Sequence, residues 1–479
     1  MKKAKKILAS ILAFALIGVL VACGGGSDSD AAADSATETP SAVEPTDGVS
    51  DDENYELIVW HHEPPAHRVK AWNTVIDMFM AENPNISVTA EVVLWEDQQA
   101  KMLSAIQTGT APDINAITET TWQSSYQAQG LVPVDDIIES IDAKEKLTES
   151  SKNGFYADDH YWAVPYACNV YSLMYRPSML EAAGYDRPPE TWSEMLEYAE
   201  KLTVDNDGDG TPDVYGIGIA SGRNALTIDT FAAFLNSNGG EVYDENGNLD
   251  FDKESTVEAL DFYAQLTQFS PPAASGWSWG EIEMNWAGGN LAMIPYHAPN
   301  LGAFFEAGDY DVATTYLPKP DGAEEFHTNF LNQALTVTKD AEERGNYPAV
   351  KKFIEFLMQP EVNWILTVCQ EPGFFMPVTE SAGDLLVSDY FDSENFPLEG
   401  FDNTPGSVHM LIMENFNEVA MESIKGAYAL GLSHGVVNLN LAEIYNSLII
   451  SDMVQKVVLE GEPAADAVAW AQVQMEDIS

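Results

Sequence analysis

The chain has 479 residues, which is too long for one ordinary hydrophobic core and predicts two or three domains. Hydrophobic residues make up 45% of it, so a large buried interior is available. The 76 acidic and 22 basic side chains give a formal net charge of −54, which excludes nucleic-acid binding through a basic surface and charge-driven binding to anionic lipids.

The N-terminal segment predicts export. The basic segment Lys2–Lys6 precedes the apolar run Ile7–Val21, whose 15 residues are too few for a comfortable membrane span and suit a secretory signal peptide. The run ends in Leu20-Val21-Ala22-Cys23, which is similar to the bacterial lipobox. We therefore expect a lipoprotein signal peptide over residues 1–22 and a lipidated Cys23 that anchors the exported chain to the bacterial cell membrane, facing outward. The alternative is a short signal anchor with an incidental cysteine, which the glycines after Cys23 disfavour.

Residues 23–54 are predicted to form a disordered acidic tether. From Gly24 onward this segment consists mostly of small, polar and acidic residues, with no aromatic and no basic side chain, so it cannot bury enough surface to fold. Beyond it, Cys168 and Cys369 are the only cysteines, and neither belongs to a CxxC motif. They could pair as a disulfide or remain two buried thiols.

Strand-like and helix-like segments alternate from Leu57 onward. The first part predicts a strand at 57–60, a helix through Val69, Trp72, Ile76 and Phe79 that ends at Asn83-Pro84, a strand at 86–92, a helix at 98–108 and a strand at 114–117. Later helices are predicted after capping boxes at Thr191–Glu194 and Ser255–Glu258, through Val350–Leu357, and at 441–448 and 463–478, with a strand near 215–219. Such alternation indicates an α/β fold with open, mostly parallel sheets, whose ligands bind outside the carboxyl ends of the strands.

Several segments in this order resemble a known family. They are Leu57-Ile58-Val59-Trp60, Phe79 to Pro84 with Ile86 and Val88, Ala105 to Asp113, Gly130 to Val134, Tyr161 to Tyr166, Tyr175-Arg176-Pro177 with Ala183-Gly184-Tyr185, Pro188 to Leu196, and Trp286 to Met293. Together they resemble the extracellular solute-binding proteins of bacterial ABC importers, in the sugar-binding family that includes maltodextrin-binding proteins. The resemblance runs from about Tyr55 to Ile478; Arg176 departs from it, because the family usually has Asn there.

The resemblance implies two discontinuous α/β lobes joined by hinge strands, the type II periplasmic-binding-protein architecture. By this analogy residues 55–165 and 331–376 form lobe I, residues 166–330 and 377–479 form lobe II, and the chain crosses near Pro165, Asn329 and Met376. The implied partners are a saccharide held between the lobes and the permease subunits of an ABC transporter. We expect a monomer that is not an enzyme.

Aromatic and polar residues cluster where the strands are predicted to end. Sugars need aromatic rings for their C–H faces and carboxylates or amides for their hydroxyl groups. The expected ligand-binding residues are Trp60, His61, Glu63, Trp95, Glu96, Trp122, Tyr166, Trp277, Trp279, Tyr296 and Phe374. Trp95, Trp279 and Tyr296 are the expected stacking rings, and Glu63 and Glu96 the expected hydroxyl acceptors, while core packing is the alternative for each aromatic residue.

Basic residues are scarce in these loops. Arg68 and Arg223 are the ones expected near the site, so an anionic ligand such as a phosphate is disfavoured. A neutral mono- or oligosaccharide fits best, and a cationic solute is compatible with the same residues. The adjacent His61 and His62 would point to opposite faces of a strand, so a zinc site is not expected there.

The segment Asp205–Asp213 has the spacing of a calcium-binding loop. Carboxylates occupy loop positions 1, 3, 5 and 9 as Asp205, Asp207, Asp209 and Asp213, and glycine occupies position 6. Position 12 is Gly216, so the bidentate glutamate of an EF-hand is missing. The loop is either a structural Ca²⁺ site or a metal-free acidic turn, and no other cofactor is expected.

Two other functions stay open. Glu281 and Glu283 would share one face if they lay on a strand, beside Trp277, Trp279 and Trp286, and could form the carboxylate pair of a lipid-anchored glycoside hydrolase. They could equally be two solvated acids. No nucleophile elbow, P-loop or dinucleotide fingerprint is present. A sensor or scavenger with the same binding fold is indistinguishable from a transport protein at this level.

Overall fold

The computed structural model describes residues 49–50, 53–297, 301–371, 373–386, 402, 404 and 406–478. The chain divides into two units, residues 1–46 and 47–479, and all described residues belong to the second. The predicted signal peptide, Cys23 and most of the predicted tether lie outside the described residues. The end of the tether segment contacts the folded body, because Asn85 Nδ2 donates hydrogen bonds to the backbone oxygens of Ser50 and Glu53 at 3.2 and 3.0 Å.

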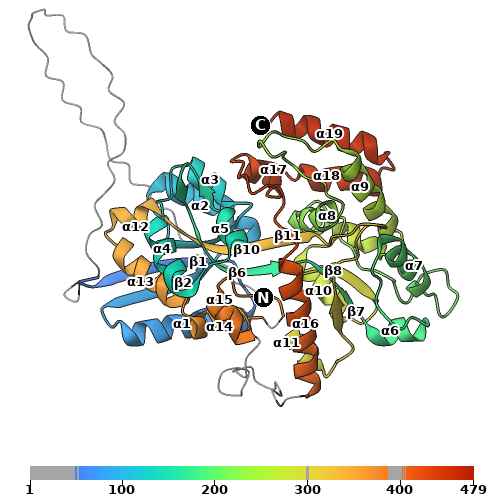
Figure 1. Ribbon diagram of the computed structural model, residues 1–479, viewed down its shortest axis with the longest axis horizontal. Helices are drawn as coiled ribbons and strands as arrows, with labels where there is room; N and C mark the ends of the chain where they lie inside the picture. Colours follow the sequence, from blue (N-terminus) through green and yellow to red (C-terminus); the bar gives the residue numbers. More distant parts are fainter. Residues whose placement is uncertain are drawn as a thin grey trace, which may run out of the picture. The chain divides into compact units, whose positions relative to one another are not determined.

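The larger sheet has the strand order β11-β10-β3-β1-β2, and β6 pairs with β10 (Figure 1). Its strands are β1 (Tyr55–His61), β2 (Ile86–Val92), β3 (Ile114–Thr118), β6 (Val164–Val170), β10 (Thr328–Val337) and β11 (Ala427–Tyr428). β1, β2 and β3 run parallel, as the alternating pattern predicts, whereas β10 is antiparallel to β3 and β6. The predicted first helix is α1 (Ala66–Glu82), which buries Trp72, Val75, Ile76 and Phe79 and ends at Asn83.

Helices and short strands make up the rest of two segments, the one before β6 and the one that follows β10. They are α2 (Trp95–Thr108), α3 (Trp122–Gln127), α4 (Asp135–Glu145), α5 (Glu149–Asn153), β4 (Tyr156–Ala157), β5 (His160–Tyr161), α12 (Lys339–Glu343), α13 (Tyr347–Leu357), α14 (Pro360–Leu366) and α15 (Glu380–Leu386). α15 packs against α4 and α14, and Thr379 forms a bridge with Leu147. Residues 379–386 thus lie against elements predicted for lobe I, although 377–479 were predicted for lobe II.

The second sheet is antiparallel, contrary to the expectation of mostly parallel sheets. β7 (Ser172–Tyr175) lies between β8 (Met293–Tyr296) and β9 (Ala313–Thr315). The strand predicted near 215–219 is not a regular strand, although Tyr215 and Gly218 donate backbone hydrogen bonds to Asn290 and Met293. A Cβ at Gly216 would lie 1.9 Å from the Ala199 oxygen, so this segment approaches a helix backbone closely.

Helices surround the second sheet and form the C-terminal part. They are α6 (Pro177–Ala182), α7 (Trp192–Leu202), α8 (Ala225–Ser237), α9 (Glu254–Thr267), η1 (Pro272–Gly276), α10 (Trp279–Ala287), α11 (Leu301–Ala307), α16 (Val408–Ile424), α17 (Leu441–Ser447), α18 (Ile449–Val458) and α19 (Ala464–Glu476). α8 is buried from Leu226 to Ser237 and packs against β10, α9 and α18 (Figure 1). Thr191 caps α7 as predicted, by accepting from Glu194 N, but α9 begins after Lys253, so the predicted cap at Ser255 is wrong.

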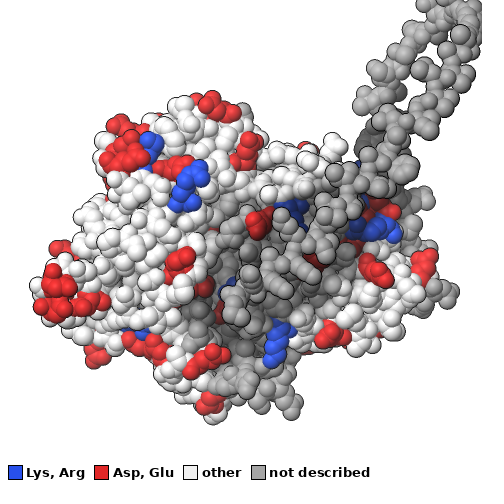
Figure 2. Space-filling model, turned by 180° about the vertical axis from the view of Figure 1, so that it is seen from behind, with Lys and Arg blue, Asp and Glu red and all other residues white. Residues whose placement is uncertain are grey.

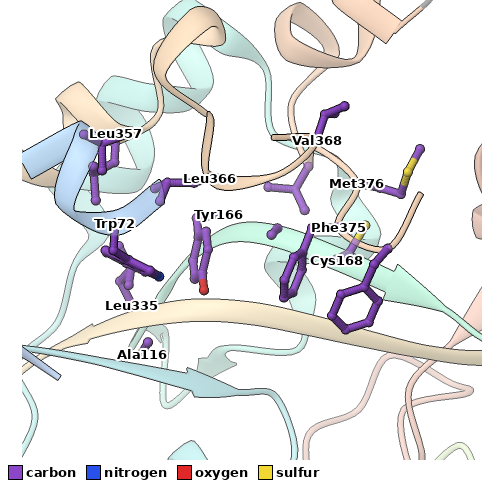
Figure 3. Packing of buried hydrophobic residues seen from close by; sticks show 14 of the residues in the cluster. Trp72, Ala116, Tyr166, Cys168, Leu335, Leu357, Leu366, Val368, Phe375 and Met376 are labelled. Carbon is purple, nitrogen blue, oxygen red and sulfur yellow. The ribbon is translucent and has the colours of Figure 1, made fainter. Parts of the chain in front are cut away.

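Three segments meet where the chain was predicted to cross. Every residue of β6 and β10 is buried, and Cys168 exchanges backbone hydrogen bonds of 2.9 and 2.8 Å with Met376. Figure 3 shows Tyr166 of β6 next to Trp72 of α1, with a ring-centroid distance of 5.8 Å. Cys168 and Cys369 are both buried thiols.

The described surface is acidic. Figure 2 shows acidic side chains spread over one face, with the few basic side chains mostly beside them. Arg187, for example, bonds to Glu194 at 2.6 Å. Among the described residues, no helix combines the length and apolar character that crossing a membrane requires.

Candidate ligand-binding cleft

A cleft of about 390 Å³ lies among the loops that follow the strands of the larger sheet. Its described lining consists of His62, Glu63, Pro64, Pro65, Arg68, Leu94, Trp95, Thr118, Thr120, Asn169, Asp229, Ser278, Trp279, Gly280, Glu283, Tyr296, His297, Leu331, Gln333, Phe374 and Tyr445. Most of these residues lie at or just after the ends of β1, β2 and β3, on β6 and β10, or at α8, α10 and β8. Arg68 comes from α1, Phe374 follows α14, and Tyr445 comes from α17. The volume lies in the range of small-molecule sites, and the place is where α/β sheets bind ligands.

Five of the residues predicted for ligand binding line this cleft. They are Glu63, Trp95, Trp279, Tyr296 and Phe374. The side chain of Glu96 lies outside the described part of the structure. The sequence therefore identified part of the cleft lining, because aromatic residues near strand ends are brought together in the cleft.

The other five predicted residues pack in the core and do not line the cleft. Trp60, His61, Trp122, Tyr166 and Trp277 are all nearly inaccessible to solvent. His61 stacks on Trp72 at 5.1 Å, and Trp122 Nε1 donates to the Gly154 oxygen at 3.0 Å. The sequence places these residues near strand ends but does not determine which face of the sheet each side chain takes.

Four stacked or tilted rings form one wall of the cleft. The imidazole of His297 lies between the rings of Tyr296 and Phe374, with centroid distances of 4.6 and 4.9 Å. Trp279 lies 5.1 Å from the same imidazole. Burial lowers the pKa of His297 to about 3, so this ring is neutral, and neither of its nitrogens has a hydrogen-bond partner among the described residues. Such a wall can hold the apolar face of a ligand and offer it one polar group.

A buried ion network lies beside this wall. Arg68 Nη1 donates to Glu63 Oε2 at 2.8 Å, and Arg68 Nε donates to Glu371 Oε2 at 3.1 Å. Burial opposes ionisation of both carboxyls. Arg68 outweighs it together with His62 at Glu63 and with His67 at Glu371, so the pKa values of both carboxyls lie below their usual range. The guanidinium also lies 4.8 Å from the centre of the Phe374 ring. The positive charge of Arg68 is thus already neutralised, while Arg223 pairs with Asp452 on the surface.

Two further carboxyls line the cleft. Glu283 Oε1 accepts from the Tyr296 hydroxyl at 3.1 Å, and burial raises the pKa of Glu283. Asp229 Oδ2 accepts from the Tyr445 hydroxyl at 3.0 Å, and burial raises the pKa of Asp229 to about 8. Sequence reasoning missed Asp229, although it is the only charged residue of the buried helix α8. An isolated acid in such a helix was the available signal.

The pair Glu281 and Glu283 does not have the geometry expected for a hydrolase. These residues lie on helix α10 instead of a strand, so two positions of separation turn the side chains to different faces. Glu281 Oε2 accepts from Ser278 N and Oγ at 2.9 and 2.6 Å and caps the helix in solvent. Glu283 alone lines the cleft.

Glu119 directly follows β3 and is buried, and its ionisation should make the stability of the protein depend on pH. Its Oε2 accepts from Asn332 N of β10 at 2.5 Å, and burial raises its pKa to about 8. The unfolded chain ionises this group near pH 4.5, whereas the folded chain keeps its proton until about pH 8. Stability is therefore lost as pH rises through that window.

Glu119→Gln removes this loss. The variant should gain free energy of unfolding over wild type as pH rises from about 4.5 to 8, by an amount on the order of a few kcal/mol. Urea denaturation at several pH values measures the difference. A difference that does not change with pH would show that Glu119 is ionised in the folded protein.

The acidic loop brings three of its four predicted metal ligands together. One carboxylate oxygen from each of Asp205, Asp207 and Asp209 lies within 4.8 Å of the others, and all three residues are exposed. Asp213 is not part of this group; its Oδ2 accepts from Asn206 N at 2.7 Å. The oxygen-rich set fits a hard cation such as Ca²⁺, with fewer ligands than the spacing predicted.

Comparison with known proteins gives the family. Residues 65–364 match the family described as bacterial extracellular solute-binding protein. A putative ABC transporter periplasmic-binding protein, YcjN of Escherichia coli K12, is 22% identical over 340 residues, which cover 68% of this chain and 74% of YcjN. The sn-glycerol-3-phosphate-binding periplasmic protein UgpB of the same strain is 23% identical over 356 residues, which cover 71% of this chain and 78% of UgpB.

Solved structures share the fold. A solute-binding protein of Thermotoga lettingae bound with alpha-D-tagatose has a TM-score of 0.71 at 20% identity, and the match covers 89% of this chain and 100% of that one. Maltose-bound MalE3 of T. maritima gives 0.70 at 17% identity over 89% and 100%. UgpB of Mycobacterium tuberculosis with glycerophosphocholine gives 0.69 at 20% identity over 88% and 98%. The fold is thus that of the type II periplasmic-binding proteins, and the chain belongs to the bacterial extracellular solute-binding proteins.

Proposed function

We propose that the protein captures a mono- or oligosaccharide without negative charge in this cleft and delivers it to the permease of an ABC importer. The observation that carries the proposal is the ring wall of Trp279, Tyr296 and Phe374 beside the carboxyls of Glu63 and Glu283. Rings stack on the C–H faces of a sugar, and carboxyls accept hydrogen bonds from its hydroxyl groups.

The electrostatics of the cleft favour a sugar over a phosphate. Arg68 is the one Lys or Arg among the described lining residues, and it is held by Glu63 and Glu371. A phosphate would compete with two buried carboxylates for that guanidinium. The relatives named for sn-glycerol 3-phosphate make this ligand the proper comparison.

A ligand panel tests the proposal. Saccharides and sn-glycerol 3-phosphate are added to the purified protein, melting temperatures are measured, and the best ligand is recovered and chromatographed. We expect stabilisation by an uncharged or positively charged saccharide, which is recovered intact. Stabilisation by sn-glycerol 3-phosphate alone would contradict the choice of ligand. A hydrolysed sugar whose formation depends on Glu283 would contradict a binding function.

Membrane attachment is proposed through lipidated Cys23. In Cys23→Ala the acyl chains cannot be added, and each CH₂ group that is not buried costs about 0.8 kcal/mol of membrane binding. We expect the variant to appear in the soluble fraction or to stay unprocessed, as measured by fractionation and by the mass of the chain. Wild-type processing and retention would show that another segment anchors the protein.

We also propose that the loop of Asp205, Asp207 and Asp209 binds Ca²⁺ as a structural ion. A metal that binds only the folded state stabilises it by about 2.7 kcal/mol at a free concentration 100 times its Kd. Added Ca²⁺ should raise the melting temperature, chelation should lower it, and Asp207→Asn with Asp209→Asn should abolish both effects. If the wild-type melting curve ignores Ca²⁺ and chelator, the loop is an acidic turn.

A further inference from the structure

Asp229 is a buried carboxyl that lines the cleft and has no cationic partner among the described residues. It is 2% exposed, and its Oδ1 has no hydrogen-bond partner among the described residues. Its Oδ2 accepts from Tyr445, and the titratable groups within its electrostatic influence are Glu119, Tyr171 and Tyr445. None of them carries a positive charge.

The other carboxyls of the cleft are better compensated. Glu63 forms an ion pair with Arg68 at 2.8 Å. Glu283 accepts from Tyr296 and lies within the electrostatic influence of Arg68. An unpaired buried carboxyl costs stability, and such groups gather where a ligand provides the missing partner. Asp229 therefore marks the point of the cleft where a positive group of the ligand would be stabilised most.

We propose that the saccharide carries an ammonium group, as amino sugars do, and that Asp229 binds it. The inference rests on the proposed function and narrows its ligand class. The ring wall of Trp279, Tyr296 and Phe374 holds the sugar. The ammonium donates to the carboxylate of Asp229 and supplies the positive charge that the Tyr445 hydroxyl cannot provide. Burial keeps the free carboxyl protonated at neutral pH. On binding, its proton passes to solvent and the carboxylate–ammonium pair forms.

Matched pairs of sugars test the inference. The β-1,4-linked glucosamine disaccharide and cellobiose differ only at the two C2 positions, as D-glucosamine and D-glucose differ at one. Calorimetric titration of the wild-type protein should give at least tenfold tighter binding of the amine in one of these pairs. Titration of the amine in two buffers of different ionisation enthalpy, at a pH low enough for the ligand amine to be already protonated, should also show release of about one proton.

Asp229→Asn provides the second arm. It should reduce the affinity for the amine to that of the neutral parent and abolish the proton release. Asp261→Asn, on the exposed face of α9, is the matched control and should keep the wild-type preference. If Asp229→Asn fails to fold, the preference of the wild-type protein for the amine, together with its proton release, decides the inference.

The outcomes separate the inference from the proposed function. Neutral sugars that bind as tightly as their amines would overturn the inference and leave a saccharide-binding protein. A preference that survives Asp229→Asn would overturn the role of this residue. Binding of no saccharide would overturn the proposed function and the inference with it.

Discussion

Arg68→Met is expected to lower the free energy of unfolding by about 3–5 kcal/mol, because it removes the arginine that pairs with two buried carboxylates and leaves each of them with only a histidine nearby. Glu63 and Glu371 are both nearly inaccessible to solvent, and Arg68 bonds to each. Methionine keeps much of the side-chain volume and loses the ion pairs and the cation–π contact with Phe374, so the loss reports the charge more than the packing. Urea denaturation of the ligand-free protein near pH 7 measures it.

An exposed ion pair is the control for this variant. Arg223 bonds to Asp452 at 2.6 Å on the surface, and Arg223→Met should cost less than about 1 kcal/mol. Adding Glu371→Gln to Arg68→Met should recover part of the stability, since one uncompensated charge is removed. Equal effects of the two arginine variants would contradict a neutralising role for Arg68.

Trp279→Ala should weaken binding of the saccharide by about 2 kcal/mol, which is roughly a thirtyfold rise in Kd. Trp279 is half-buried, lines the cleft and lies against Tyr296 and His297. The loss comes from the stacking surface offered to the ligand. Calorimetric titration with the best ligand of the panel measures it, and the melting temperature without ligand should change little.

Trp277, two residues earlier, gives the matched contrast. It is 4% exposed and packs in the core. Trp277→Ala should cost about 3–5 kcal/mol of stability through the cavity it leaves, while the protein that stays folded binds with nearly wild-type affinity. If both variants weaken binding equally, the ligand reaches further than the cleft lining indicates.

Local sequence patterns predicted much of the larger sheet. β1, α1 and β2 follow from alternating or helical spacing of apolar residues and from the Asn83-Pro84 break. The second sheet was predicted with the wrong strand direction, since direction depends on how distant strands pair. The hydrolase alternative required Glu281 and Glu283 to lie on a strand, whereas the capping box of Ser278 and Glu281 begins helix α10 there.

The candidate cleft was predicted only in part, for a similar reason. Trp95 and Trp279 could be named because each begins a helix after an extended segment. Trp122 also begins a helix and Trp60 lies near the end of β1, and yet both side chains turn into the core. Asp229 comes from the middle of a buried helix, so its place in the cleft depends on the packing of α8 against β10. Such packing is not visible in local spacing.

The strand order of the larger sheet also determines how the chain can fold while it is being synthesised. β3 ends at Thr118, but its neighbour β10 begins only at Thr328. At about 5–20 residues per second, a ribosome needs roughly 10–40 s to make the intervening segment. During that time β3 presents an unpaired edge of buried-type residues, which other chains can pair with. The nascent chain should therefore depend most on chaperones before β10 emerges.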